Sequence, residues 1–222
     1  MSASAALLQL ADSRFPTGAH AHSAGIEASY ARGDVRNVAD LADFLDGRLL
    51  TTAPVEAAFA AAANGTSDLR ELDHQLAIRT PSPRLRVVSR TLGRQLLRPA
   101  ERAWPSAKYA ALRALHPDGP MQPVALGVVA EAAGLTPFDA ALCSLHHLVG
   151  TVAAGAIRLL GLDPFEVHAI TARMGPRLDA LASVAAQQAA TLNPAALPAT
   201  NSMLADILAE HHATWEVRLF AS

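Results

Sequence analysis

The chain contains 222 residues, of which 51% are hydrophobic, 17% charged and 5% aromatic, and its formal net charge is -2. This hydrophobic fraction excludes intrinsic disorder, and the near-neutral charge differs from the basic excess of a nucleic-acid-binding protein. The length predicts one domain whose core is large enough to fold without disulfides or metals.

The single cysteine, Cys143, excludes an internal disulfide and a multi-thiolate zinc site. The apolar N-terminus lacks the basic residues that begin a signal peptide, and it reaches Asp12 and Arg14 too early for one. No run approaches the roughly 20 apolar residues of a membrane span. We therefore expect a cytoplasmic protein without a membrane partner.

Alanine and leucine dominate the sequence, and apolar residues recur at three- and four-residue steps, which predicts an all-helical protein. In the first half, Ser23 and Asn37 are positioned to cap helices, and Pro99 is expected to kink or end a long amphipathic helix. The expected helices cover residues 23–30, 38–49, 54–63, 69–78 and about 84–99. An irregular connection is expected over 104–119.

In the second half, Thr136 and Asp163 each precede a proline and stand three residues before an acid, a pattern typical of helix starts. The expected helices cover 123–133, 137–160, two segments separated by Gly175-Pro176, and 202–213. Because 137–160 is apolar on nearly every side, it is expected to be the buried central helix of a single multi-helix bundle over 1–222. The tail 214–222 follows the last helix.

Histidine is the residue type that most suggests a metal site, since the chain has nine. The adjacent pairs at 146–147 and 211–212 point about 100° apart on a helix, and no HExxH motif occurs. The pair His20 and His22 is different, because an extended HxH places both rings on one side. That loop is interpreted either as a transition-metal site or as a turn that holds the start of the next helix.

Nucleotide-binding and acyl-transfer motifs are missing from the sequence. There is no GxxxxGK[ST], GxGxxG or GxSxG. Cys143 stands four residues before His147, but it lies inside the apolar helix, where burial raises the pKa of a thiol. We expect Cys143 to be an inert core residue and the chain to have no catalytic residues.

Arginine recurs every four residues in the stretch after Pro83, opposite the leucines. The members of this stripe are Arg86, Arg90, Arg94, Arg98 and Arg102. It is interpreted either as a solvated helix face or as a docking face for an acidic surface on a partner or on a second copy. A complement within the chain is offered by Asp40, Asp43 and Asp46.

Taken in order, several segments resemble the UreF family of urease accessory proteins in its actinobacterial form. The opening LLQLADSRFPTGAHAHSAGIE at 7–27 is similar to the family's LxLADSxxPTG followed by HSxGxE. Further similarity lies in SRTLGRQLL at 89–97, PVALGVVAEAAG at 123–134 and RLFAS at 218–222. The sequence departs from the family pattern at two places. Residues 158–163 read RLLGLD where the family has RLxPLGQ, and His20 stands where an aromatic residue is usual.

The resemblance implies an all-helical, non-catalytic scaffold without a cofactor of its own. Such a protein would form a homodimer, bind a UreD/UreH-type accessory protein and recruit the GTPase UreG to the urease apoenzyme for nickel insertion. Nickel and GTP would be handled by the partners. The alternative is a helical metal-binding protein or metalloenzyme that uses the His20/His22 loop.

The resemblance also implies partner-binding residues in two main patches. The N-terminal patch is a recognition surface or a water-lined passage, and it comprises Pro16, Thr17, Gly18, His22, Ser23, Glu27 and Tyr30. The tail patch comprises Arg218, Leu219, Phe220 and Ser222, which either become ordered on a partner or dock onto the chain's own core. Arg158 is added to these patches, where it faces the GTPase or pairs with a helix C-terminus. Arg90 and Arg94 complete the set of partner-binding residues as members of the arginine stripe, not through the resemblance.

Overall fold

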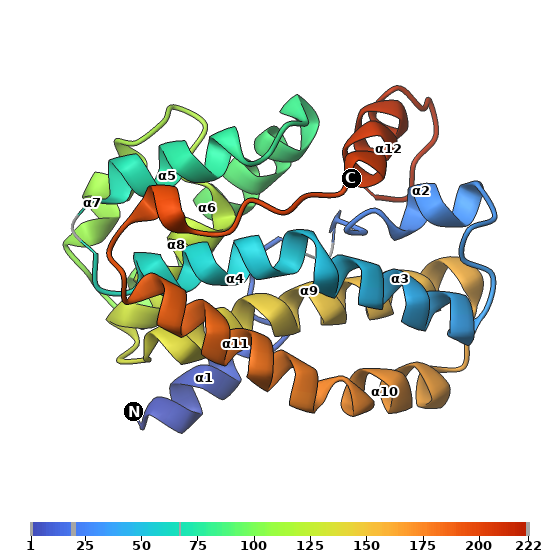
Figure 1. The fold of residues 1–222 in the computed structure, drawn as a ribbon, viewed down its shortest axis with the longest axis horizontal. Coiled ribbons are helices and arrows are strands. Elements are labelled where there is room, and N and C mark those ends of the chain that lie inside the picture. The colour runs from blue at the N-terminus through green and yellow to red at the C-terminus, as the bar shows by residue number, and fades with distance from the viewer. Residues whose placement is uncertain (1, 19–20, 67, 221–222) are drawn as a thin grey trace.

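A computed structural model describes residues 2–18, 21–66 and 68–220, and within them the chain forms twelve α-helices, one 3-10 helix and no strand (Figure 1). The first six helices are α1 (Ala3–Ala11), α2 (Ile26–Ala31), α3 (Val38–Leu50), α4 (Thr52–Ala63), α5 (Leu69–Ile78) and α6 (Pro83–Ala103). The others are α7 (Lys108–Arg113), α8 (Gln122–Ala132), α9 (Pro137–Leu160), α10 (Pro164–Arg173), α11 (Gly175–Ala189), η2 (Pro194–Ala196) and α12 (Met203–Ala213). The all-helical fold class is confirmed.

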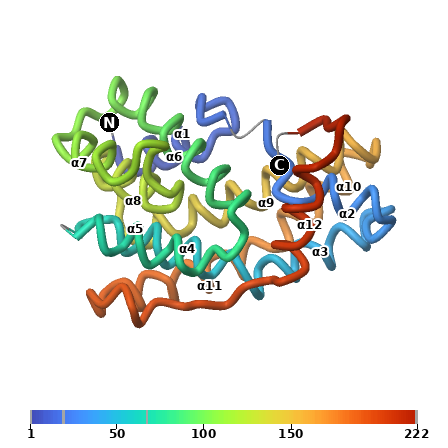
Figure 2. The backbone as a smooth tube through the Cα atoms, turned by 90° about the horizontal axis from the view of Figure 1, so that it is seen from above, coloured from blue at the N-terminus to red at the C-terminus, as the bar shows by residue number. Residues whose placement is uncertain are grey.

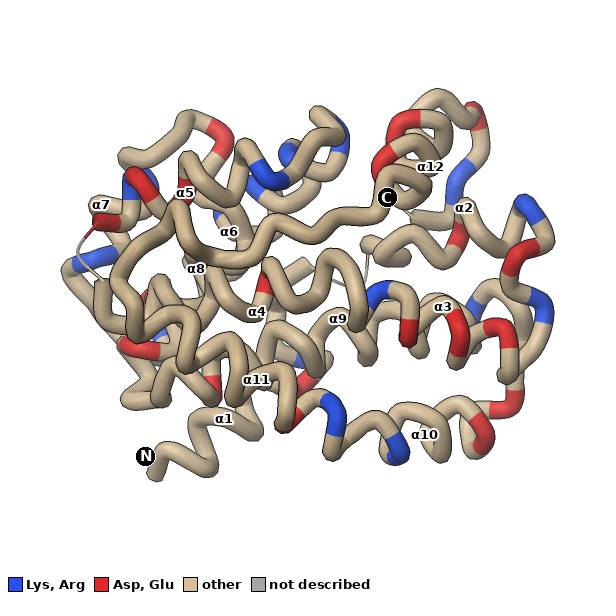
Figure 3. Tube along the Cα trace, in the orientation of Figure 1, with Lys and Arg blue, Asp and Glu red and all other residues tan. Residues whose placement is uncertain are grey.

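The centre of the bundle is α9, as its composition predicts. It packs against α4, α8 and α11, and its inner side chains, including Leu145 and Val152, are buried. By length and composition α9 is apolar enough to cross a membrane, contrary to the expectation that no segment qualifies, but 61% of its most apolar window is buried inside the fold. The helix is therefore the core of the bundle, and Figure 3 shows few charged residues along it.

Close packing of α4 on α8 requires a residue without a side chain at Gly127. A Cβ atom there would overlap the carbonyl oxygen of Ala60 and the side chain of Ala63. Both helices are alanine-rich on this side, and Ala57, Ala60 and Ala61 are fully or almost fully buried. Small residues bring the two helices close together, which explains how a chain with few aromatic residues fills its core.

Most predicted helix starts are confirmed by capping geometry. The side chains of Asn37, Asp68 and Ser202 each accept a hydrogen bond from the backbone N–H three residues later. Thr136 and Asp139 form a reciprocal capping box at the start of α9. These caps satisfy backbone donors that the first turn of a helix leaves unpaired.

Three local predictions are corrected by the structure. The helix expected at Ser23 begins at Ile26, because Gly25 has a φ of 90° in the left-handed region and interrupts the helical path. The connection over 104–119 contains α7, which is held by buried Tyr109. Of the two alternatives for Pro99, ending the helix is wrong, because α6 continues through it to Ala103.

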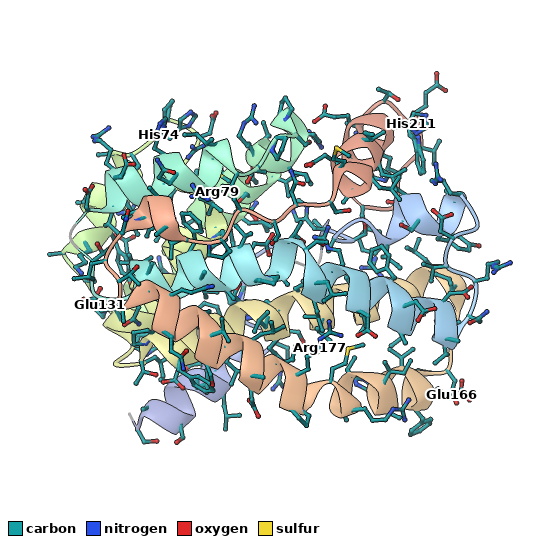
Figure 4. All side chains as sticks on the ribbon, in the orientation of Figure 1. His74, Arg79, Glu131, Glu166, Arg177 and His211 are labelled. Atoms are coloured by element: carbon teal, nitrogen blue, oxygen red, sulfur yellow. The ribbon has the colours of Figure 1, made fainter. Side chains whose placement is uncertain are left out.

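The aspartates of α3 do not complement the arginines of α6. Asp40 pairs with Arg36 at 3.2 Å, and Asp46 pairs with Arg177 of α11. Figure 3 shows the acidic residues along α3, and Figure 4 shows Arg177 between α11 and α3. The intramolecular pairing that the sequence offered is therefore wrong.

A long connection returns the chain from α11 to α12, on the side of the molecule where α2 lies (Figures 1 and 2). Arg79 at the end of α5 holds this connection, as Figure 4 illustrates. Its guanidinium donates to the carbonyl oxygens of Ala195, Leu197 and Pro198 at 2.9, 3.3 and 3.2 Å. This arrangement directs α12 and the tail back to the N-terminal part of the chain.

Candidate functional site

Glu27 of the N-terminal patch and the tail patch form one cluster in the folded chain. Helix α2 packs on both α9 and α12, so residues near positions 27, 158, 212 and 220 come together. The described part of the tail contacts α2 through Glu27. Parts of the two patches that the sequence treats separately therefore belong to one site.

The carboxylate of Glu27 is the polar centre of this cluster. It is 7% exposed and accepts hydrogen bonds from the backbone N–H groups of Leu219, at 2.8 Å, and Phe220, at 3.1 Å. It also lies 2.8 Å from Nε2 of His212, a side chain that is 3% exposed. Because a carboxylate is an acceptor, His212 donates from Nε2, and the three donors satisfy a buried charge that would otherwise be costly.

The tail packs onto the chain's own fold in this structure. Phe220 is 5% exposed, and the guanidinium carbon of Arg158 lies 4.7 Å from its ring centroid, which is cation–π geometry. Trp215 packs against His212 with 4.7 Å between ring centroids. Arg158 thus contacts the tail as well as being near the C-terminus of α9. Ser222 lies outside the described residues, as does His20 of the histidine pair.

Other members of the tail and of α2 lie at the surface of the same cluster. Leu219 is 69% exposed, Tyr30 is 43% exposed, and Arg218 is exposed with Nη1 3.4 Å from the carbonyl oxygen of Ala213. Ser23 is fully buried, and its hydroxyl accepts the N–H of Glu27 at 3.5 Å. Ser23 thus supports α2 from within its first turn, although it is not the N-cap that the sequence predicted.

The loop before α2 approaches α6 rather than forming an open surface. Pro16 is exposed, whereas Thr17 and Gly18 are half-buried. Gly18 has a φ of 79°, and a Cβ atom there would overlap the side chain of Gln95. His22 is 8% exposed, and burial together with the nearby charge of Arg84 lowers its pKa. His22 is therefore a buried, mainly neutral ring.

The arginine stripe is not a continuous surface, and the assignment of Arg90 to a docking face needs correction. Arg90 is 8% exposed; its Nη1 and Nη2 atoms lie 3.0 Å from Oδ2 of Asp73, and Nη1 also donates to the carbonyl of Gly119 at 2.8 Å. The other oxygen of Asp73 accepts the N–H of Met121 at 2.7 Å. Arg90 is a structural ion-pair residue, whereas Arg94 is exposed and donates to the carbonyl of Asp118.

A cavity of about 220 Å³ lies between the N-terminal loop and helices from both halves of the chain. Most of its wall is apolar, and Leu92 and Leu148 are typical members. One wall carries Arg48, Thr52 and Glu56. His22 and Thr17 of the predicted patch also line it, which places part of the proposed recognition surface inside the fold.

His147 and Cys143 do not form a reactive pair. The Sγ atom of Cys143 is 3.6 Å from Nε2 of His147, but burial raises the thiol pKa to about 12. Burial lowers the pKa of His147 to about 4, and its Nε2 lies 2.9 Å from the carbonyl oxygen of Leu10. A neutral ring donating to that carbonyl fixes α1 on α9. The thiol is a core residue, as its sequence position suggests.

Within the described ranges, no group of three or more His, Cys, Asp or Glu side chains lies close enough to hold a metal ion. Sequence reasoning missed Arg48 and Glu56, since a single charged residue on a helix is typical of a solvated face. No spacing in the sequence relates the two, because the non-helical residue Thr51 separates α3 from α4. It missed Asp73 as well, because nothing in its neighbourhood indicates a partner 17 residues away.

Comparison with known proteins identifies the class of protein to which this helical bundle belongs. A family model described as UreF matches residues 35–175. The urease accessory protein UreF of Mycobacterium sp. (strain JLS) is 41% identical over 218 residues, covering 97% of each chain. Those of Mycolicibacterium vanbaalenii and Mycobacterium marinum are 38% and 41% identical over the whole of each chain. The chain belongs to the UreF family of urease accessory proteins.

Proposed function

We propose that this protein acts in the maturation of urease as a non-catalytic scaffold for nickel insertion. It binds a UreD/UreH-type accessory protein, recruits the GTPase UreG to the urease apoenzyme, and leaves nickel and GTP to those partners. The observation that carries the proposal is full-length similarity to proteins named urease accessory protein UreF, at 38–41% identity. A homodimer and a cytoplasmic location are parts of the same proposal, and the single cysteine is compatible with the latter.

The surface beside the Glu27 cluster supports partner binding. Helix α12 exposes Met203 and Ile207 by 75% and 64%, and the tail exposes Val217 and Leu219 by 87% and 69%. Apolar side chains gathered at one end of a fold favour contact with another protein. Arg94 is a separate exposed cation: its guanidinium donates to the carbonyl of Asp118, whereas Glu210 of α12 contacts Ser82 and Arg84 at the start of α6.

The test is co-expression of a urease with its other accessory proteins, with and without this chain, in a host that has no UreF of its own. We expect nickel-loaded, active urease only when the chain is present. Equal nickel content and activity in its absence would overturn the proposal. Nickel analysis of the untagged chain alone also separates the scaffold from a metal-binding protein, which would retain about one ion per chain and lose it in His20→Ala.

The role of the α12 surface is tested with matched substitutions. Ile207→Ser on α12 is expected to weaken capture of the UreD/UreH-type protein at least tenfold, because it removes an exposed apolar contact. The control is Phe165→Ser, which is 86% exposed on α10, a helix that lies on the opposite side of the molecule from α12 in Figure 1. A stronger effect of the control than of Ile207→Ser would contradict this choice of surface.

A further inference from the structure

The cavity contains polar groups that the protein itself leaves without hydrogen bonds. Arg48 lies in the last turn of α3, Thr52 begins α4 and Glu56 follows one turn later, and all three side chains line the cavity. The Nε of Arg48 and the Oγ1 of Thr52 are buried and have no partner in the described part of the chain. Buried polar groups nearly always have a hydrogen-bond partner, so these two atoms are available to a ligand or to water in the cavity.

Charges of both signs meet at this end of the cavity. Asp206 of α12 also lines it, and the Asp206 and Glu56 carboxyls act electrostatically on Arg48. Burial raises the pKa of Glu56 and of Asp206, and it lowers that of Arg48. An anion alone would face two carboxyl groups, and a cation alone would face a guanidinium. A ligand that carries both charges complements this wall better than either ion alone.

The rest of the wall sets the size and character of the ligand. Apolar side chains from α4, α6 and α9 surround the remaining space, among them Val55, Val88 and Leu148. A volume of about 220 Å³ exceeds the roughly 150 Å³ of an apolar cavity that holds one benzene molecule. The space therefore accommodates a side chain of four or so carbon atoms together with a charged head group.

We propose that this cavity binds a small zwitterion with an apolar side chain, namely an apolar α-amino acid such as leucine. Its carboxylate lies against the Arg48 guanidinium and the Thr52 hydroxyl, its ammonium faces Asp206 and Glu56, and its side chain lies among the leucines and valines. The site is independent of the urease role, because it is defined by this chain alone.

The test uses the purified full chain and L-leucine, followed by thermal unfolding and calorimetry. At about 10 mM, a ligand with a Kd of about 1 mM fills most sites and raises the Tm by about 3–5 °C. The matched probes are 4-methylpentanoate, which lacks the ammonium group, and isopentylamine, which lacks the carboxylate. We expect each to bind at least tenfold more weakly than leucine.

Variants assign the binding to the cavity wall. Thr52→Val keeps the shape of the side chain, and Arg48→Met removes the guanidinium; both are expected to weaken leucine binding at least fivefold. The control is Arg102→Met, at an exposed position of α6, and this variant should bind leucine as the parent protein does. If Arg48→Met does not fold, as judged by circular dichroism, Thr52→Val and Glu56→Gln decide. Any of three results would overturn the proposal: no Tm change with any probe, equal binding of all three probes, or full binding of leucine by every folded wall variant. The cavity would then contain only water.

Because the experiment uses the isolated chain, its failure would not bear on urease maturation. Conversely, failure of the co-expression test would leave leucine binding unchanged.

Discussion

The carboxylate of Glu27 on α2 accepts the backbone N–H of Phe220 in the tail, 193 residues later in the chain. Leu219 donates to the other carboxylate oxygen, and His212 completes the set. The tail is thus held through its backbone by one buried side chain. Its side chains at 217 and 219 remain exposed for other contacts.

Replacing Glu27 with glutamine should release the tail. A glutamine side chain offers one acceptor oxygen and turns an N–H₂ toward a backbone donor, so at least one buried hydrogen bond is lost, at a cost of about 1–3 kcal/mol. We expect faster amide exchange over residues 215–220 and faster removal of the tail by carboxypeptidase. Glu216→Gln in the exposed part of the tail is the control. Unchanged protection in Glu27→Gln would show that Phe220 packing alone holds the tail.

The Arg90–Asp73 pair should be essential for stability rather than for partner binding. Removing one member leaves an unpaired buried charge, so Arg90→Met is expected to lower the free energy of unfolding by about 3–5 kcal/mol. Chemical denaturation measures the change. The double variant Arg90→Met with Asp73→Leu should lose less free energy of unfolding than the sum of the two single variants, because it leaves no unpaired buried charge.

Arg94 provides the matched control for that pair. It lies one helical turn away and is exposed. Its guanidinium donates to the backbone carbonyl of Asp118 at 3.1 Å. Arg94→Met should change stability by less than about 0.5 kcal/mol. Similar losses for Arg94→Met and Arg90→Met would mean that the buried ion pair contributes little.

The chain should lose stability on acidification through His147. Its pKa is about 4 in the folded protein and about 6.5 when unfolded, so the unfolded state binds more protons between these values. Neutral His147 therefore contributes about 3 kcal/mol to the free energy of unfolding. This contribution is fully present above about pH 6.5 and is lost progressively as the pH falls to about 4.

Substitution of His147 by glutamine tests this assignment. A glutamine Nε2 donates to the same Leu10 carbonyl but does not titrate, so the dependence of unfolding free energy on pH should become flatter between about pH 4 and 6.5. His146→Gln, at an exposed position of the same helix, should keep the slope of the parent protein. If the His147→Gln slope matches that of the parent, another group is responsible.

Arg79 should determine how firmly the connection before α12 is held. Arg79→Met removes donors to three carbonyl groups and the contact with the Phe59 ring, whose centroid lies 5.5 Å from the guanidinium carbon. We expect faster amide exchange and proteolysis over residues 194–202 and a loss of about 1–3 kcal/mol. Arg70→Met on the exposed side of α5 should leave the connection protected.

Local sequence patterns were enough to predict the helical class, most helix bounds and the central position of α9. These features depend on local signals: periodic apolar residues, capping side chains such as Asn37 and Thr136, and glycines after helix ends. The similarity of the opening and tail motifs also identified the UreF family. Local errors arose where one residue redirected the chain, as Gly25 does before α2.

Tertiary structure alone decided which polar residues meet. Nothing in the sequence pairs Glu27 with Phe220, Arg90 with Asp73 or Arg79 with the 195–198 carbonyls. The helical period of α6 placed Arg90 opposite the leucines, whereas packing of α5 and the 119–121 segment buried it. Periodicity reports which face of one helix is polar, but burial depends on which other elements cover that face, and only the assembled fold specifies that.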